Sequence, residues 1–437
     1  MSFSIGLSGL YAANKSLDVT GNNIANVATT GFKSSRTEFQ DQYAASIRGT
    51  SGTTNVGSGV KVAAVSQQFT QGTMSTGTNR SLDLAIQGNG FFQVSKNGEA
   101  LYTRAGAFHT DSQGFIVDND GNNLQGYSVD ANGNIATGSL TNLRIDSSNQ
   151  PAKPTTKTTM AANLNSSDAV VKISPFDPTN TDSYTSTWNT QFVDSQGNTH
   201  NMNQYYAKTA TNTWQMYTLV DGRNAANPAS TVPDSTTLTF NSDGSLNTGA
   251  LTPGGNIAVN PDGTFTLNNW VPAAQVGTTT TWVANGAVAN AGGIKLDMLK
   301  LTQTNGAPGI ITNTPDGYPS GQLADMSVDA SGNLFATYTN GPSRSLGMVS
   351  LTNFANVQGL IPVGGTMWKQ SFASGAPVTG APETGTLGAI NGDTLENSNV
   401  DLTSELVSLI QEQSNYQANA KTISTQSTIM QTLIQMT

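Results

Sequence analysis

The two ends of this chain carry the same hydrophobic period. Near the start, steps of four and three residues alternate along Phe3, Leu7, Leu10, Asn14, Leu17, Gly21, Ile24 and Ala28. Near the end, the same steps join Leu402, Leu406, Leu409, Gln413, Tyr416, Ala420, Ile423, Ser427, Met430 and Ile434. This spacing places one stripe along each helix, which is the seam geometry of a coiled coil. We therefore expect terminal helices that meet, with the rest of the chain looped out between them.

The first helix, expected over residues 3–29, is weak by itself. Gly6, Gly9 and Gly21 each cost on the order of 1 kcal/mol relative to alanine, and its asparagines prefer turns. Gly31 suits the left-handed residue that follows a helix end. Because the intrinsic propensity is low, packing against a partner must supply most of the stability.

The middle of the chain is expected to be β. Residues 82–87 and 214–219 alternate between apolar and polar side chains, which predicts strands. A four-residue pattern with Asp or Asn first and Gly fourth recurs, beginning at Asp111, Asp118, Asp130, Asp194, Asn241, Asn260 and Asp329. Such residues favour a type I turn followed by a left-handed glycine, as in short hairpin loops. The repetition predicts an antiparallel, hairpin-built architecture.

The expected fold is mainly β with α-helical termini. The N- and C-terminal helices pair as a coiled coil, and nested, discontinuous antiparallel β domains are looped out between them. Gly-, Ser- and Thr-rich stretches at 49–59 and 374–385 predict soft connectors. The expected parts are a terminal helical domain (1–30 plus 400–437), a connector (31–70 plus 370–399), an inner β domain (71–149 plus 319–369) and an outer inserted β domain (150–318).

Composition excludes several functions. A net charge of −9 and a pI of about 4.6 argue against nucleic acid as a partner. No Lys/Arg cluster suggests an anionic membrane, and no stretch approaches the ~20 apolar residues of a membrane helix. Cysteine is absent, so no disulfide framework or thiolate site is expected. The first thirty residues do not read as a cleaved secretory signal.

Residues capable of chemistry are few. Neither His109 nor His200 has a second histidine at a ligand spacing, so both are expected at or near the surface rather than in a metal or catalytic site. A Ser-His-Asp set stays open, although no Gly-x-Ser-x-Gly elbow supports it. Residues 118–123 hint at calcium and 88–93 at a dinucleotide fingerprint, but their glycines are misplaced and turns are favoured. We expect no enzyme activity, metal or cofactor.

The outer face of the last helix carries few charges. Glu405, Glu412 and Lys421 stand among Gln, Asn, Ser and Thr, whereas isolated two-stranded coils usually carry charged flanks. This favours burial against further copies of the chain over packing on the β domains. The candidate assembly interface is Leu7, Leu10, Leu17, Ile24, Leu402, Leu406, Leu409, Tyr416, Ile423, Met430 and Ile434.

Several longer motifs resemble one protein family, the bacterial flagellar rod and hook axial proteins. The segment NNIANVATTGFK (22–33) is similar to the family's N-terminal signature. Three further segments resemble its β-domain motifs: DLAIQGNGFF (83–92), YTRAGAF (102–108) and LQGY (124–127). Two more resemble its C-terminal motifs: ENSNVDL (396–402) and QSNYQANA (413–420).

The length of the chain favours the hook branch of this family, because rod members lack a large inserted outer domain. The resemblance implies a structural subunit that polymerises into a flexible, curved helical tube and acts as a universal joint between rod and filament. It implies contacts with copies of itself and with the distal rod protein, the hook cap, the hook–filament junction proteins and the flagellar export apparatus. It also implies an extracellular location, reached without a cleaved signal.

Two alternatives remain at this stage. The chain could be another axial part, either a distal rod or a hook-associated protein. It could also be a secreted β-rich glycan-binding protein, whose sugar contacts would be exposed aromatics such as Trp188, Trp214, Trp270 and Trp282. The second alternative leaves the paired terminal stripes unexplained.

Overall fold

The computed structural model describes residues 2–42, 57–130, 133–277, 281–288 and 290–436. The chain forms two compact units, and each is described by itself. Unit 1 comprises residues 1–147, 324–337 and 343–437, and unit 2 comprises residues 148–323 and 338–342. Most of the first soft connector expected, 49–56, lies outside the described residues. The finer division into four parts stays a prediction.

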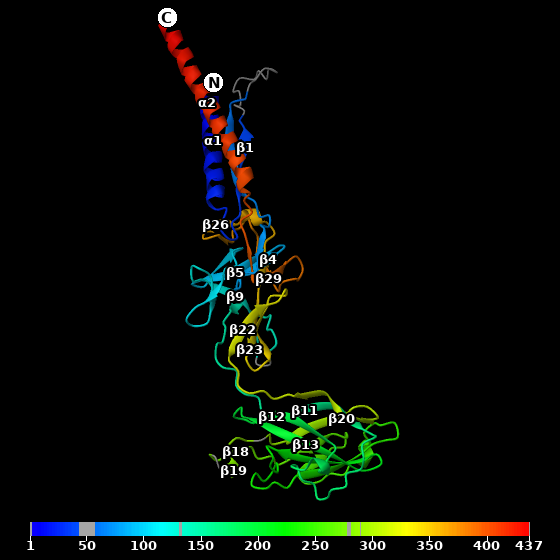
Figure 1. Cartoon of the computed structure of the whole chain (residues 1–437). Helices are drawn as coiled ribbons and strands as arrows, with labels where there is room; N and C mark the ends of the chain where they lie inside the picture. Colours follow the sequence, from blue (N-terminus) through cyan, green and yellow to red (C-terminus); the bar gives the residue numbers. More distant parts are fainter. Residues whose placement is uncertain (1, 43–56, 131–132, 278–280, 289, 437) are drawn as a thin grey trace. The chain divides into compact units, whose positions relative to one another are not determined.

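Two long helices of unit 1 confirm the pairing of the chain ends. Helices α1 (Ser2–Ala25) and α2 (Leu402–Met436) run side by side, and both chain ends lie at the same end of the pair (Figure 1). Helix α2 begins after Asp401, whose Oδ1 accepts a hydrogen bond from the backbone N–H of Ser404 at 2.9 Å. This is the N-cap arrangement that satisfies an otherwise unpaired helix donor.

Helix α1 ends at Ala25, four residues before the predicted end at 29. The side chain of Asn23 exchanges two hydrogen bonds of 2.9 Å with the backbone of Ser35, which turns the chain away from the helix axis. Gly31 has φ +68°, and a Cβ there would lie 2.5 Å from the backbone nitrogen of Ala105. Glycine is therefore required at 31 by a close backbone approach within unit 1, rather than by the helix end.

Unit 1 contains a hairpin beside α1 and a large sheet. The hairpin pairs β1 (Ser35–Asp41) with β2 (Val60–Gln67). The main path of the sheet runs β22-β23-β24-β9-β5-β6-β27-β26. The other strands of the unit are, in chain order, β3 (Met74–Thr76), β4 (Leu84–Gln87), β5 (Phe91–Lys96), β6 (Glu99–Thr103), β7 (His109–Thr110), β8 (Ile116–Val117), β9 (Asn123–Ser128), β10 (Thr141–Asn142), β22 (Leu323–Val328), β23 (Asn333–Tyr338), β24 (Ser343–Val349), β25 (Leu351–Asn353), β26 (Ile361–Gly364), β27 (Met367–Lys369), β28 (Val378–Gly380), β29 (Ala389–Gly392) and β30 (Thr394–Glu396).

The soft connector expected over 370–399 is wrong as a description of that segment. Three short strands form there: β28 pairs with β25, β29 with β4, and β30 with β3. The Gly/Pro/Ser-rich composition suggested a linker, but backbone hydrogen bonds to strands far away in the sequence hold the segment on the strands β3–β10 and β22–β30 of unit 1, here called the β body. The chain therefore reaches α2 along an ordered path.

Unit 2 is a sandwich of two sheets that share one core. One sheet has the order β12-β13-β14-β15 and the other β16-β17-β20-β11-β21, with β18 and β19 as a separate pair. The strands are β11 (Lys157–Asn165), β12 (Ser186–Val193), β13 (Thr199–Ala210), β14 (Thr213–Val220), β15 (Asp234–Thr239), β16 (Ile257–Val259), β17 (Phe265–Leu267), β18 (Ala273–Gln275), β19 (Trp282–Ala284), β20 (Ile294–Thr304) and β21 (Gly309–Pro315).

Among the described strand pairs of both units the pairing is antiparallel, as predicted, with one exception. Strands β11 and β20 are parallel, because most of unit 2 lies between them in the sequence and the chain returns in the same direction. All the predicted Asx-x-x-Gly turns form. In each, the glycine N–H donates to the carbonyl of the first residue and the glycine has positive φ.

The core of unit 2 weighs against a glycan-binding face built on the tryptophans. Trp188, Trp214 and Trp270 are buried, and Trp214 is 0% exposed. Its Nε1–H donates to Gln303 Oε1 at 2.6 Å, so the indole is both packed and hydrogen-bonded. Only Trp282 is partly exposed. Within the described ranges, no helix is long and apolar enough to cross a membrane.

The central position of Trp214 generates a first prediction. Trp214→Ala should lower the unfolding free energy of unit 2 by roughly 3–5 kcal/mol, because it leaves a cavity and an unpaired Gln303 amide. Differential scanning calorimetry of the full chain should show a lower transition temperature. Trp282→Ala is the matched control and should have a much smaller effect; equal effects would contradict the assigned core.

Candidate functional site

The pair of terminal helices is the candidate site. A Cβ built at Gly6 would lie 3.0 Å from Ile423 Cγ1, and Ser16 Oγ donates to the Glu412 carboxylate. Farther along, Asn23 Nδ2 donates to Glu405 Oε1 at 3.1 Å. The contacting residues run from 6 to 23 along α1 and from 423 to 405 along α2, so the two helices are antiparallel.

The seam between the two helices consists of small and polar side chains. A Cβ at Gly9 would lie 2.4 Å from Asn419 Oδ1, so glycine permits the close approach there. The α1 seam residues keep the spacing of the predicted stripe but lie one position earlier in the sequence: Gly6, Gly9, Ala13, Ser16, Thr20 and Asn23. Periodicity alone could not show whether the predicted leucine stripe or this stripe of small residues faces α2. The regular spacing of the small residues themselves was a signal that could have been used.

Most residues of the predicted interface are left uncovered by this pairing. Five of them are partly buried: Leu10, Leu17, Ile24, Leu409 and Ile423, of which Ile423 lies against Gly6 across the seam. The others are exposed: Leu7, Leu402, Leu406, Tyr416, Met430 and Ile434. No residue of α2 is buried. Their role in assembly stays a prediction, and the fold of the single chain leaves these side chains available.

Two carboxylates lie in the seam without a cationic partner among the described residues. Burial raises the pKa of Glu405, the charge of Glu412 adds to this, and the hydrogen bond from Asn23 opposes it. Glu412 Oε2 is inaccessible to solvent and has no hydrogen-bond partner. Two carboxylates in the seam without a counter-charge weaken the association of the helices rather than strengthen it.

A hollow of about 420 Å³ lies between α1, α2 and the β1–β2 hairpin. Its apolar lining comes from Ile5, Ala12, Ala13, Phe39 and Val60, with Glu412 at one side. Phe39 is 47% exposed although it borders this hollow. The helix pair is therefore incompletely packed within one chain.

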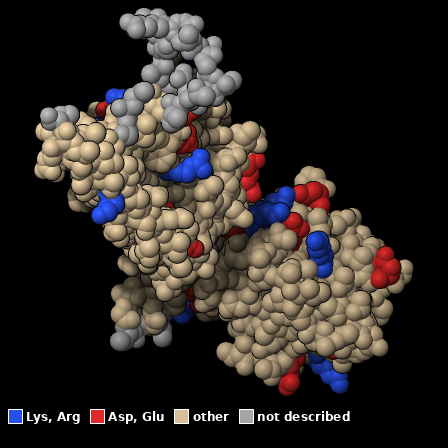
Figure 2. All heavy atoms as spheres, turned by 90° about the horizontal axis from the view of Figure 1, so that it is seen from above, with Lys and Arg blue, Asp and Glu red and all other residues tan. Residues whose placement is uncertain are grey.

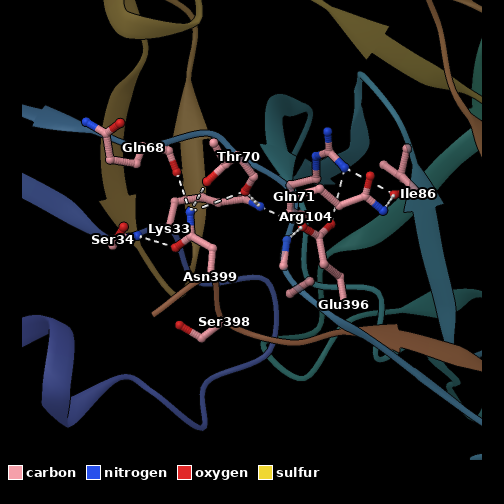
Figure 3. A network of polar contacts seen from close by, with 12 residues as sticks. Lys33, Ser34, Gln68, Thr70, Gln71, Ile86, Arg104, Glu396, Ser398 and Asn399 are labelled. Atoms are coloured by element: carbon pink, nitrogen blue, oxygen red, sulfur yellow. Dashed lines mark hydrogen bonds and ion pairs between the residues drawn. The ribbon is translucent and has the colours of Figure 1, made fainter. Parts of the chain in front are cut away.

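A buried ion cluster joins the bases of the two helices to the β body (Figure 3). Glu396 Oε1 accepts from Lys33 Nζ at 2.6 Å, and Glu396 Oε2 accepts from Arg104 Nη1 at 3.2 Å. The backbone N–H of Gly72 donates to Glu396 Oε1 at 2.9 Å. Lys33 also donates to the carbonyl of Thr70 at 2.7 Å. The side chains of Lys33 and Glu396 are 0% exposed, so the cluster is sealed from water.

The cluster is extended by Asn399, three residues before α2. Its side chain accepts from the backbone N–H of Ser34 at 2.8 Å and donates to the carbonyl of Gln68 at 2.7 Å (Figure 3). Burial lowers the pKa of both Lys33 and Arg104, and Glu396 partly offsets this in each case. The carboxylate of Glu396 thus supplies the counter-charge for the two buried cations.

Unit 2 holds a second buried ion cluster that sequence reasoning missed. His200 is 3% exposed, and its Nδ1 lies 2.7 Å from Asp221 Oδ2 and its Nε2 3.3 Å from Asp194 Oδ2. Burial opposes protonation of His200, but the two carboxylates outweigh it and raise its pKa. For Asp194, burial by itself would raise the pKa. Hydrogen bonds from Asn198, Asn285 and His200 outweigh this effect and hold the pKa of Asp194 at about 2. The cluster is fully satisfied and explains His200 as a structural residue.

Comparison with known proteins places these features in one class. Four family models match along the chain: "Flagella basal body rod protein" (3–33), "Flagellar hook protein FlgE/F/G D1 domain" (85–153), "Flagellar basal body protein FlaE D2 domain" (163–318) and "Flagellar basal body rod FlgEFG protein C-terminal" (392–436). The class is therefore that of the axial proteins of the bacterial flagellum.

Full-length relatives narrow the class. The chain is 40% identical over 442 residues to the flagellar hook protein FlgE of Escherichia coli K12, with 100% of each chain covered. It is 39% identical over 449 residues to the flagellar hook protein FlgE of Salmonella typhimurium, again with 100% of each covered. The crystal structure of the Helicobacter pylori flagellar hook protein FlgE2 aligns with a TM-score of 0.49 at 13% identity, covering 73% of this chain and 99% of that one. The chain belongs to the flagellar hook protein family.

The ion cluster at Glu396 generates a second prediction. Glu396→Gln should lower the unfolding free energy of unit 1 by roughly 3–5 kcal/mol, because Lys33 and Arg104 stay buried without a counter-charge. Urea denaturation followed by circular dichroism would measure it. Glu99→Gln is the matched control, since Glu99 pairs with Lys369 at the surface and should change stability by less than about 1 kcal/mol.

The His200 cluster generates a third prediction. Because the pKa of His200 is raised above its ordinary 6.5, its stabilisation is complete below about that pH and is lost as pH rises through the folded-state pKa. The pKa of Asp194 is lowered from 3.8 to about 2, so its stabilisation is lost as pH falls through that range.

His200→Gln should therefore flatten the decline of the unit 2 melting temperature between pH 6 and 9, measured by calorimetry. His109→Gln, at an exposed histidine, should keep the wild-type profile. An unchanged slope in His200→Gln would show that the cluster does not control this pH dependence.

Proposed function

We propose that this chain is a structural subunit of the bacterial flagellar hook that polymerises through its terminal helices. The observation that carries this proposal is the apolar stripe left exposed on α2. Most of its large side chains are exposed by a third or more, including Ile434 at 71%, Met430 at 53% and Leu406 at 44%. A soluble monomer gains nothing from such a stripe, whereas a subunit that meets further copies buries it.

The geometry of the helix pair supports this proposal. Gly6 faces Ile423, and α1 begins at Ser2, so α1 reaches only to about residue 427 of α2. The end of α2 (427–436) extends past the start of α1 (Figure 1). Helices with few buried contacts are marginal in water, so neighbouring copies would supply the missing packing.

The proposed interface is the stripe predicted from the sequence. Burial of one such leucine between copies would contribute on the order of 2–5 kcal/mol per subunit, judged by the cost of truncating buried leucines. Its members are Leu7, Leu10, Leu17, Ile24, Leu402, Leu406, Leu409, Tyr416, Ile423, Met430 and Ile434. In this proposal the terminal domain (1–30 plus 400–437) builds the inside of the tube, and the inserted domain (150–318) lies farthest out.

Bending would depend on the low charge of the outer surfaces. Only 11% of residues are charged, and Figure 2 shows charged side chains scattered over a largely uncharged face. Contacts between β bodies of neighbouring copies would then be polar and hydrated, with few ion pairs to lock them. Such contacts can slide, as a flexible, curved tube that passes torque from rod to filament requires.

The same role implies particular partners and a location. The subunit would contact the distal rod protein at one end of the tube, and the hook cap and then the junction proteins at the other. It would be delivered by the flagellar export apparatus, without a cleaved signal peptide, to the outside of the cell. No nucleic acid and no membrane insertion is part of this proposal.

The extension of α2 generates a fourth prediction. Deletion of 427–437 should leave the melting temperature of the monomer nearly unchanged, because these residues lie beyond α1, and should abolish tube formation. Electron microscopy under conditions where the unmodified chain polymerises would measure it. Thr432→Ala is the control, since it removes only a hydrogen bond within the helix; tubes formed by the deletion variant would refute the proposal.

A further inference from the structure

One aromatic side chain of unit 1 is wholly exposed. Phe372 has a relative exposure of 106%, higher than any other large hydrophobic side chain described. It lies in a turn that follows β27 and precedes β28. Scattered apolar side chains on a surface need no explanation, so the surroundings of this ring decide whether it has a function.

The turn that carries the ring is rigidly braced. Ser371 Oγ donates to the carbonyl of Gly359, and Ser374 Oγ donates to the carbonyl of Ser371 at 2.8 Å. Ser374 is 0% exposed. From the neighbouring segment, Asn356 Nδ2 donates to the carbonyl of Ala373 at 3.0 Å. The backbone is therefore fixed on both sides of the exposed ring.

A packed base holds this turn from below. A Cβ at Gly359 would lie 2.4 Å from the carbonyl carbon of Ala373, so the two segments are in direct contact. Beneath them, Phe91, Phe354 and Trp368 belong to one buried aromatic cluster. The exposed ring of Phe372 is therefore attached to a rigid part of the β body.

Further apolar side chains stand on the segment next to this turn. Ile361 and Val363 of β26 are 51% and 47% exposed, and β26 begins two residues after Gly359. The nearby cation Lys369 is paired with Glu99. Phe372, Ile361 and Val363 thus place exposed apolar side chains on two segments that contact each other at Gly359 and Ala373, while Asp120 borders the far end of β26 at Gly365.

We propose that Phe372 anchors a contact with a second copy of this chain in the assembled polymer. An aromatic ring on a rigid turn loses little conformational freedom on binding, and such rings are the residues that dominate interface energies. The occupant is a second copy because the proposed function has this chain assemble by repetition of itself, and the surface of the chain, in which only 11% of residues are charged, suits an apolar ring.

The contact is separate from the helical interface. It lies on the β body, and in a helical polymer a patch can meet a different surface of the next copy without closing a ring. The inference rests on the proposed self-assembly, so its test must distinguish failure of this contact from failure of assembly.

The test uses the full-length chain and Phe372→Ser. The melting temperature of the monomer should be unchanged, because the ring is wholly exposed. The protein concentration needed for tubes should rise about tenfold or more. Ile311→Ser is the matched control, at a 71% exposed apolar residue of unit 2. Equal critical concentrations for Phe372→Ser and wild type, or an equal rise in Ile311→Ser, would overturn the inference.

A second measurement locates the partner. The photo-reactive analogue p-benzoylphenylalanine at position 372 should give covalent dimers of this chain after irradiation of tubes, and none with dilute monomer. Tubes without such dimers, or cross-links only to another flagellar protein, would overturn the anchor while leaving assembly intact. If the wild-type chain forms no tubes, the proposed function fails instead.

Discussion

A single buried carboxylate fixes the base of the terminal helix pair, where α1 has ended and α2 begins. Glu396 binds Lys33, Arg104 and the backbone at Gly72, so segments from both ends of the sequence and from the β body meet at one point. Without it both cations would be buried with no counter-charge, which is strongly destabilising. Asn399, three residues before α2, then bridges to Ser34. Because both segments are fixed at this base, the register of the helix pair is set there, and the pair needs little attraction of its own.

Because the base of the helix pair sets the register, the seam itself does not have to be strongly attractive, and this explains its composition. Gly6, Gly9 and Ser16 permit close approach but bury little apolar area, and Glu405 and Glu412 add unpaired carboxylates to it. If leucines formed the seam within the chain, their stripe would be buried there and could not contact other copies in the proposed assembly. Since the seam is built from small and polar residues instead, the leucines stay outside. In the proposed assembly, the contacts between copies would use mostly other side chains of the same helices than the fold of the single chain does, with Ile423 shared by both.

The sequence predicted what local chemistry decides and failed where distant partners decide. The Asx-x-x-Gly turns formed because their four residues contain the whole cause, and the paired ends followed from matched periods. The face of α1 that meets α2 was not predictable from spacing, because Leu7 and Gly6 belong to stripes with the same period. The strands within 370–399 were missed because their hydrogen bonds come from β25, β4 and β3. The His200 cluster was missed because Asp221 reaches it only through the β13–β14 pairing.

The two surfaces left unsatisfied in unit 1 differ in stiffness. The α2 stripe lies on a helix with no buried residue, so its shape depends on the copies that cover it. Phe372 lies on a turn hydrogen-bonded to the β body on both sides, so its position is set before any partner arrives. A polymer built from both would combine an inner layer that orders on assembly with outer contacts of fixed geometry. Bending would then be taken up where the outer surfaces are polar, uncharged and free of such anchors.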